Sequence, residues 1–319
     1  MNEKSSIDII GAGVNGLSCG LLLLEKGYDV TIYAKDFSPN TTSDIAAAIW
    51  VPFHCGPVDK VPRWAADTLS YFQQYIVPDE NSGCFPEKLI TYFREPELDP
   101  SWASLVDLHR VATDKLPVGF VDGYEFESLM MDSSLYMPYL TKLFTSKGGR
   151  LIQEEITDIR SFLVSHPLIV NCSGLGSRTL FNDNEVFPSR GQVMRVKPME
   201  LSDAVCYNAV SEDLVFVMPR KHDVILGGTA QDNDWRSEVD EADNERMIKD
   251  SGLIGAQVSP ESVLETRVGF RPSRDAIRLE TEEIDGNHVI HNYGHGGGYT
   301  LSWGCAMDVL SLAEGIIRQ

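Results

Sequence analysis

A short apolar run that ends in a glycine-rich turn, close to the start of the chain, constrains the fold more than any other feature. Residues 7–10 read IDII and lead into GAGVNG, and the following LSCGLLLLEKGYDV is typical of a helix that stops at Gly27 before a second strand, DVTIYA. Gly11, Gly13 and Gly16 have the GxGxxG spacing, which permits a tight turn, close backbone approach to a pyrophosphate and close packing of helix on sheet. The strand, turn and helix together predict a Rossmann-type dinucleotide site, in preference to a glycine-rich turn without a ligand.

The second predicted strand departs from the pattern of NAD-binding proteins. In that pattern an acidic residue at the end of the strand holds the ribose hydroxyls. Here Ala34 and Lys35 come first, and Asp36 follows slightly late. The departure weakens an NAD interpretation, while Lys35 and Asp36 remain candidates for the adenosine end of another dinucleotide.

Two further glycine-rich turns follow apolar strands later in the chain. PLIVNCSGLGSR covers residues 167–178, and HVIHNYGHGGG precedes a long C-terminal amphipathic helix. Between them, RGQVMRVKP, LVFVMP and DVILGGTA predict an antiparallel sheet. Because three such turns converge most simply on one sheet, we expect an α/β fold, in which a discontinuous Rossmann-type cofactor domain carries an inserted, mainly antiparallel substrate domain. The predicted boundaries are 1–52, 130–185 and 286–319 for the cofactor domain, and 53–129 and 186–285 for the substrate domain.

The charge balance limits the class of partner. The chain has 27 basic and 47 acidic residues and a formal net charge of -20, which argues against nucleic acid and anionic membranes, since little would neutralise their phosphates. Its six cysteines form no CxxC pair, and no apolar run reaches about 18 residues, so we expect neither a zinc site nor a membrane span. The N-terminus has no signal-peptide pattern, which favours a cytoplasmic protein.

Fixed positive charge gathers in one segment of this acidic chain. Residues 269–280 read GFRPSRDAIRLE and place Arg271, Arg274 and Arg278 within eight positions. A guanidinium can hold a carboxylate with two hydrogen bonds, so the segment is a candidate site for an anionic substrate. The alternative is that these arginines pair with nearby carboxylates on a solvated face.

Eight motifs occur in order along nearly the whole chain, namely GAGVNGLS, TTSDIAAAIW, GYEFESLMMDSSLYMPYL, VNCSGLGSR, FPSRGQVMRV, VILGGTAQ, GFRPSRDAIRLE and HNYGHGGGYTLSWGCA. In these motifs the sequence resembles the D-amino-acid oxidase family, which includes D-aspartate oxidase. The resemblance implies FAD as the cofactor, and oxidative deamination of a D-amino acid by hydride transfer to flavin N5. The imino acid would hydrolyse to a 2-oxo acid and ammonia, and oxygen would reoxidise the flavin to give hydrogen peroxide.

The resemblance also implies roles for single residues. The last arginine of the RP-containing motif, Arg278, would grip the substrate carboxylate, while Arg271 and Arg274 would structure the segment. The glycine run before the final helix, with Gly297 at its centre, would provide backbone contacts to the flavin and the substrate amine. His295 is expected to be a structural turn residue, because hydride transfer needs no base. The residues implied for the cofactor are Gly11, Ala12, Gly13, Val14, Asn15, Lys35, Asp36, Thr42, Ser43, Ala48, Ile49, Ile156, Ser173, Gly296, Gly298, Tyr299 and Thr300.

This sequence departs from the family near its substrate site. Phe216 stands where the family usually has a tyrosine that bonds the carboxylate, and Tyr207 is a candidate replacement donor. We expect neutral or hydrophobic D-amino acids as substrates. A preference for D-aspartate would need a second cationic group, for which Arg220 and His54 are candidates, and N-substituted glycines are a further alternative.

Two interpretations from other classes stay open at this stage. Phe216 is compatible with a flavin-binding protein that does not turn over, and GxGxxG alone is compatible with an NAD-dependent dehydrogenase. The expected partners are a small-molecule D-amino acid and oxygen, without nucleic acid or membrane, and the sequence leaves a homodimer open.

Overall fold

The computed structural model describes residues 5–52, 55–207 and 214–318. The strands are β1 (Ser6–Ile10), β2 (Asp29–Ala34), β3 (Cys84–Phe93), β4 (His109–Arg110), β5 (Asp122–Met131), β6 (Arg150–Gln153), β7 (Leu168–Asn171), β8 (Phe187–Val196), β9 (Ala204–Tyr207), β10 (Val215–Pro219), β11 (Val224–Gly227), β12 (Gln231–Asp232), β13 (Val263–Ile284) and β14 (Asn287–His295). The α-helices are α1 (Val14–Glu25), α2 (Thr42–Ile45), α3 (Val61–Tyr71), α4 (Ser133–Ser146), α5 (Ile159–Leu163), α6 (Ser177–Leu180), α7 (Glu241–Ser251) and α8 (Gly298–Ile317). Shorter helical turns are Phe72–Ile76, Ala103–Leu105, Thr113–Lys115, Gly174–Gly176, Gly252–Ile254 and Pro260–Ser262.

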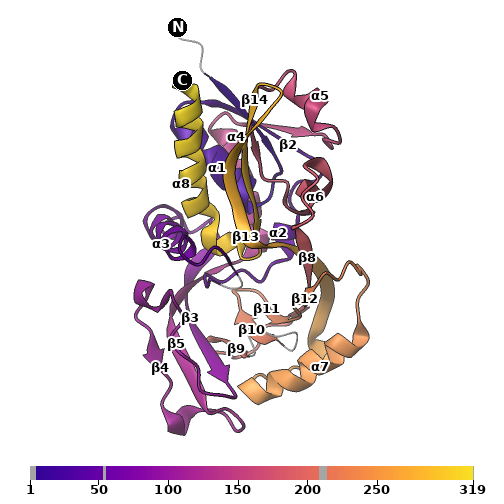
Figure 1. Ribbon diagram of the computed structural model, residues 1–319. Helices are drawn as coiled ribbons and strands as arrows, with labels where there is room; N and C mark the ends of the chain where they lie inside the picture. The colour runs from indigo at the N-terminus through magenta and orange to yellow at the C-terminus, as the bar shows by residue number, and fades with distance from the viewer. Residues whose placement is uncertain (1–4, 53–54, 208–213, 319) are drawn as a thin grey trace.

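One 14-stranded sheet passes through both ends of the elongated molecule (Figure 1). Its order is β4-β5-β3-β9-β10-β11-β8-β13-β14-β7-β1-β2-β6, with β12 paired to β8 outside this path. The last five strands, from β14 to β6, pair in parallel, whereas most of the others pair antiparallel. The sheet therefore changes character along its width, as the predicted combination of a Rossmann-type part and an antiparallel part requires.

The parallel part is buried on both faces. All four residues of β7 and the last four of β1 are buried, which explains why these strands read as continuous apolar runs in the sequence. The helices α1, α4 and α8 pack here, and α1 approaches α4 so closely that a Cβ added at Gly20 would lie 2.7 Å from the Phe144 ring. By length and composition alone α8 could span a bilayer, but half of it is buried in this fold, against α1 and α3. We interpret α8 as a core helix.

The antiparallel part lies at the opposite end of the molecule and carries α7 on its outer side (Figure 1). The strand β13 connects the two parts, because its residues 263–273 pair with β8 and its residues 278–284 pair with β14. The register shifts between Ser273 and Arg278. Our domain boundary at residue 285 stays a prediction, and β13 contributes to both parts of the sheet.

Candidate active site

A cleft of about 610 Å³ opens at the carboxyl ends of β1, β7 and β14, where ligands of open α/β sheets bind. We call it the cofactor cleft. Its floor is the glycine turn between β1 and α1. Gly11 has φ 108°, and a Cβ there would overlap the carbonyl oxygen of Cys172. A Cβ at Gly16 would overlap the carbonyl oxygen of Gly11, so only glycine permits this close turn at both positions.

The start of α1 faces the cofactor cleft with polar groups that lack a partner. The N-cap residue Gly13 has no side chain to cap this helix, and the Val14 N–H donates a hydrogen bond of 3.0 Å to the Ser43 hydroxyl. The first turn has no acidic residue, so the positive end of the helix dipole can meet an anion. The side-chain oxygen of Asn15 is buried without a hydrogen-bond partner, although the Asn15 amide nitrogen lies 3.2 Å from Nδ1 of His295. An unpaired acceptor inside a cleft needs a donor from a ligand. These features fit a dinucleotide such as FAD.

The far end of the cofactor cleft is formed where β2 and β6 end side by side. This parallel pair brings Lys35 and Asp36 next to residues 154–157, and Lys35 Nζ lies 3.1 Å from Glu155 Oε1. The predicted Ile156 lies in the same wall. Sequence analysis missed Glu154 and Glu155, whose carboxylates suit ribose hydroxyls, because the pairing of β2 with β6 crosses more than 100 residues of sequence.

A second cavity of about 380 Å³ joins the cofactor cleft, and both share Val14, Asn15, Ser43 and His295 among their lining residues. We call it the apolar cavity. The glycine run before α8 forms one of its sides, held where Tyr299 donates a hydrogen bond of 2.7 Å to the carbonyl oxygen of Ser43. The predicted residues found in this lining are Thr42, Ser43, Ala48, Ile49, Phe216, Gly296, Gly297, Gly298, Tyr299 and Thr300.

The walls of the apolar cavity that lie away from the cofactor cleft come from the antiparallel strands. Leu89, Tyr124, Leu214 and Phe216 give this part a hydrophobic surface. A Cβ added at Gly227 would overlap the Phe216 ring, so the ring packs directly against that glycine of β11. This apolar surface is suited to a hydrophobic side chain.

Arg271 is the one cation among the described residues that line the apolar cavity. Its Nη1 donates a hydrogen bond of 2.9 Å to the carbonyl oxygen of Thr229, and no carboxylate pairs with it in the part of the chain that the structure describes. A Cβ at Gly191 would lie 2.6 Å from Nη1, so the guanidinium lies directly over that glycine. Desolvation lowers the pKa of Arg271 from its ordinary value. Because one bond uses one of five N–H donors, the group retains capacity to bind an anion.

The structure does not bring Arg278 to either cavity, and this corrects the role that the resemblance implied for it. Its Nε and Nη2 donate hydrogen bonds of 2.8 Å to Glu280 and Glu282, and its Nη1 donates one of 3.0 Å to the hydroxyl of Tyr293. Burial opposes the shift, but these hydrogen bonds raise the pKa of Arg278. Arg274 also pairs with carboxylates, those of Asp183 and Glu185. The arginine presented to a ligand is the first of the three.

Tyr207 does not replace the missing hydroxyl at Phe216. In the pairing of β9 with β10, Phe216 is opposite Cys206, and both line the apolar cavity. Successive side chains of a strand point to opposite faces, so Tyr207 points away from the cavity. Its ring packs edge to face on Phe120, with centroids 5.4 Å apart, and Arg94 lies over it. The apolar cavity therefore receives no tyrosine hydroxyl from either predicted position.

The two groups considered for an acidic substrate side chain are likewise not placed to serve it. Arg220 is buried in ion pairs, 3.0 Å from Asp132 and 2.7 Å from Asp223, and it does not line the apolar cavity. His54 lies outside the described residues. Among the lining residues that are described, nothing offers a second cation.

His295 lies where the two cavities meet and has both ring nitrogens engaged. Nδ1 accepts from the Asn15 amide at 3.2 Å, and Nε2 donates to Oδ1 of Asn292 at 3.0 Å, which describes a neutral imidazole. Burial lowers the pKa of His295 to about 3. Both nitrogens have partners, so His295 orders the turn and has no lone pair available to act as a base.

Comparisons with known proteins agree with this geometry. A family model described as FAD dependent oxidoreductase matches residues 7–312. The chain is 40% identical to a D-amino-acid oxidase of Dictyostelium discoideum over 323 residues, covering 98% of this chain and 92% of that protein. It is 31% identical to a human D-aspartate oxidase, with 98% and 95% covered. A crystal structure of glycine oxidase from Bacillus cereus superposes with a TM-score of 0.79 at 17% identity, covering 98% and 95%, and this likeness confirms the predicted fold class.

Proposed function

Because the chain belongs to the FAD dependent oxidoreductase family, we propose that it oxidises D-amino acids with neutral or hydrophobic side chains, and that oxygen is its second substrate. The family match also confirms the prediction that FAD is the cofactor, and it removes the NAD-dependent alternative. The observation that carries the proposal is the position of Arg271, a cation that lines an apolar cavity beside the cofactor cleft and pairs with no carboxylate among the described residues.

In this proposal Arg271 binds the substrate carboxylate. A guanidinium can present two parallel N–H groups to a carboxylate, and such charge-assisted pairs are stronger than neutral hydrogen bonds. The surrounding desolvation strengthens the electrostatic attraction further. With the carboxylate held at Arg271, the amino acid Cα would lie between the strands of the antiparallel part and the glycine run before α8.

The shape and chemistry of the remaining walls support a neutral or hydrophobic side chain. Leu89, Leu214 and Phe216 would contact it, and burial of apolar surface contributes about 25 cal/mol per Å². A side-chain carboxylate would enter a cavity whose described lining has a single cation, already used for the α-carboxylate. Desolvating an unpaired charge is unfavourable, so D-aspartate should be a poor substrate.

The reaction we propose needs few groups from the protein. Bound FAD supplies the acceptor for a hydride. The chain orients the amino acid through Arg271, excludes water with the walls of the apolar cavity, and keeps His295 neutral within the turn. With the substrate amine neutral, its lone pair would form the C=N bond as the Cα–H bond breaks with its electron pair, which gives a protonated imino acid. Water would hydrolyse this to a 2-oxo acid and ammonium. With oxygen as the final acceptor, the second product would be hydrogen peroxide.

A substrate panel tests this function. The purified, FAD-saturated protein would be assayed for peroxide and ammonia with D-alanine, D-methionine, D-phenylalanine and D-aspartate, with their L-enantiomers, and with glycine and sarcosine. We expect turnover of neutral D-enantiomers only. The rates of peroxide formation with D-phenylalanine and D-methionine should exceed the rate with D-aspartate. A protein that binds flavin but oxidises none of these would contradict the proposal. Preference for D-aspartate or sarcosine would overturn the substrate class while leaving the cofactor assignment intact.

A further inference from the structure

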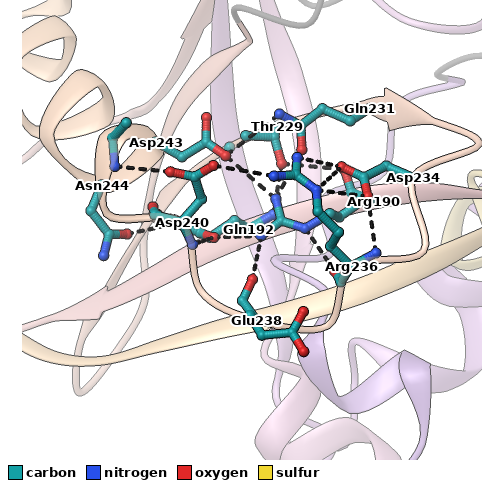
Figure 2. A network of polar contacts seen from close by, with 12 residues as sticks. Arg190, Gln192, Thr229, Gln231, Asp234, Arg236, Glu238, Asp240, Asp243 and Asn244 are labelled. Carbon is teal, nitrogen blue, oxygen red and sulfur yellow. Dashed lines mark hydrogen bonds and ion pairs between the residues drawn. The ribbon is translucent and has the colours of Figure 1, made fainter.

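A buried polar network joins β8 to residues 229–244, which follow β11 (Figure 2). At its centre is Arg190 of β8, whose side chain is completely buried. All five of its N–H donors are engaged, with partners at 2.7–3.4 Å. These partners are the carbonyl oxygens of Arg236 and Glu238 and the side chains of Gln192, Gln231 and Asp243. The network therefore fastens the segment that follows β11 onto β8.

Gln192 extends the network along the same face of β8. Its side-chain nitrogen donates hydrogen bonds of 2.8 Å to the carbonyl oxygen of Asp240 and 2.9 Å to Asn244, and its oxygen accepts from Arg190 and from the Asp240 backbone. Arg190 and Gln192 are two residues apart in a strand, so both side chains point to the network. Gly191 between them points the other way, into the apolar cavity, where the Arg271 guanidinium lies over it.

Thr229 connects this network to Arg271. Its hydroxyl accepts a hydrogen bond of 2.8 Å from the Gln192 backbone nitrogen and donates one of 3.2 Å to the carbonyl oxygen of Arg190. Its own carbonyl oxygen accepts the 2.9 Å hydrogen bond from Arg271. Thr229 is completely buried, so these contacts are not shared with solvent. The hydroxyl anchors the residue to β8, and the carbonyl oxygen then meets the guanidinium.

We propose that Thr229 is a positioning residue for substrate binding, because its hydroxyl fixes the carbonyl oxygen that orients the Arg271 guanidinium. The inference rests on the proposed function, since it assumes that Arg271 binds the carboxylate. Two contacts fix the position of the Arg271 guanidinium, namely the surface of Gly191 and the carbonyl oxygen of Thr229. A carboxylate bonded to the guanidinium would neutralise it, whereas the carbonyl oxygen of Thr229 orients it without adding a charge.

The test compares three threonine variants that retain the size of the side chain as far as possible. Thr229→Val removes the hydroxyl, and Thr229→Ser restores it. Thr68→Val is the matched control, because the Thr68 hydroxyl is also buried and also accepts a backbone N–H at 2.8 Å, from Gly304, but lines neither cavity. For each, KM and kcat would be measured with D-phenylalanine, the Kd of benzoate by calorimetry, and FAD content by absorbance.

We expect Thr229→Val to raise KM and the benzoate Kd roughly tenfold with a smaller change in kcat, since a misplacement of about 1 Å can cost up to about 100-fold. Thr229→Ser should return both to within about twofold of the parent, and Thr68→Val should leave both unchanged. A Thr229→Val protein with normal KM and benzoate Kd, or a Thr68→Val protein with the same increases, would overturn the inference.

Two further measurements keep the test decisive. If Thr229→Val does not fold with FAD, Gln231→Met replaces it, because this change removes one partner of Arg190 at a half-buried position and should raise KM about threefold. Unchanged KM in Gln231→Met would then count against the network. A parent protein that oxidises no D-amino acid and binds no benzoate would overturn the proposed function itself. A parent that does both, with Thr229→Val unaffected, would overturn only the role of Thr229.

Discussion

The arginines in the two halves of β13 have opposite surroundings. In the half that pairs with β8, Arg271 faces the apolar cavity and bonds only a backbone carbonyl among the groups that the structure describes. In the half that pairs with β14, Arg278 is surrounded by Glu280, Glu282 and Tyr293. The same residue type, seven positions apart on one strand, is thus available to a ligand in one half and neutralised in the other.

The difference teaches that the neighbours of an arginine decide its role, more than its place in a motif does. Arg278, Glu280 and Glu282 alternate along the strand, and residues two apart share a face, so the ion pairs could have been predicted from the spacing. At the equivalent positions, two and four residues further on, Arg271 has Ser273 and Asp275, and no ion pair joins Arg271 to Asp275 in the structure. The spacing predicts the ion pairs of Arg278, but only the structure shows that Arg271 bonds no carboxylate among the described residues.

The largest expected difference between the two halves comes from replacing Arg271, the arginine that lines the apolar cavity. We expect Arg271→Met to lower kcat/KM for D-phenylalanine by about 100-fold or more, because two hydrogen bonds to a charged group contribute about 1.5–3 kcal/mol each. FAD content should be retained, since Arg271 is not among the residues that line the cofactor cleft. Steady-state kinetics and the flavin absorbance of the purified variant would measure both effects.

Arg278→Met is the matched control on the same strand. It should leave KM within about twofold, and it should lower the free energy of unfolding by about 1–2 kcal/mol, because partly exposed ion pairs and one hydrogen bond are lost. Loss of substrate binding in Arg278→Met, with Arg271→Met active, would reverse the assignment of the two halves. Urea unfolding of both variants separates stability from binding.

A smaller effect is expected from changing the surface on which the cavity arginine lies. In Gly191→Ala the new Cβ would lie 2.6 Å from Nη1 of Arg271, so the flexible guanidinium has to move while the strand backbone can stay. We expect KM to rise about tenfold with FAD binding unchanged. Gly315→Ala in α8 is the control, because nothing lies within 4 Å of its added Cβ. Equal KM values in the two variants would show that the position of the guanidinium does not matter.

The smallest expected effect is on the pH dependence of stability, and it comes from the half of β13 that pairs with β14. Burial opposes the shift, but His291 and Arg278 hold the pKa of Glu282 below its ordinary value of 4.5, and burial together with Arg278 lowers the pKa of His291 to about 4. As pH falls, the unfolded chain takes up these protons first, at His291 below about 6.5 and at Glu282 below about 4.5. Protonation of both groups therefore lowers the free energy of unfolding as the pH falls.

Glu282→Gln removes one of these two titrations. We expect it to reduce the loss of stability below pH 4.5 by about 0.5–1 kcal/mol, a modest value because the carboxylate is partly solvated. The exposed neighbour Glu283 provides the control variant Glu283→Gln. Urea unfolding at several pH values would measure how steeply the free energy of unfolding changes with pH. The same slope in Glu282→Gln and in the parent protein would mean that the ion pairs around Arg278 contribute nothing to the pH dependence of stability.

Much of the cofactor cleft could be predicted from local sequence. The turn at Gly11, Gly13 and Gly16 is encoded within a few residues, and α1 ends at Glu25, just before the predicted stop at Gly27, which adopts φ 93°. The other two glycine turns also follow apolar strands where the sequence places them. Short-range patterns of this kind depend on backbone conformations that only particular residues adopt, so they survive without knowledge of the rest of the fold.

The apolar cavity was harder to predict from the sequence, because it depends on which faces of distant strands meet. Tyr207 and Phe216 are both in the antiparallel part, but the pairing of β9 with β10 turns only Phe216 toward the apolar cavity. Likewise, the contact of Arg271 with Thr229 joins residues 42 positions apart. A shift of one residue in either pairing would exchange the two faces, and no local pattern reports that register.

By itself the sequence determined the family, the cofactor and the segment that contains the arginine proposed to bind the substrate, because glycine turns and apolar strands are local and specific. Tertiary structure decided which arginine of that segment faces the apolar cavity. It also decided that Phe216 has no replacement hydroxyl at Tyr207, and that a buried network reaches Arg271 through Thr229. The physical reason is that the availability of a charge depends on burial and on partners, and both are brought together only when β8, β11 and β13 pair in one sheet.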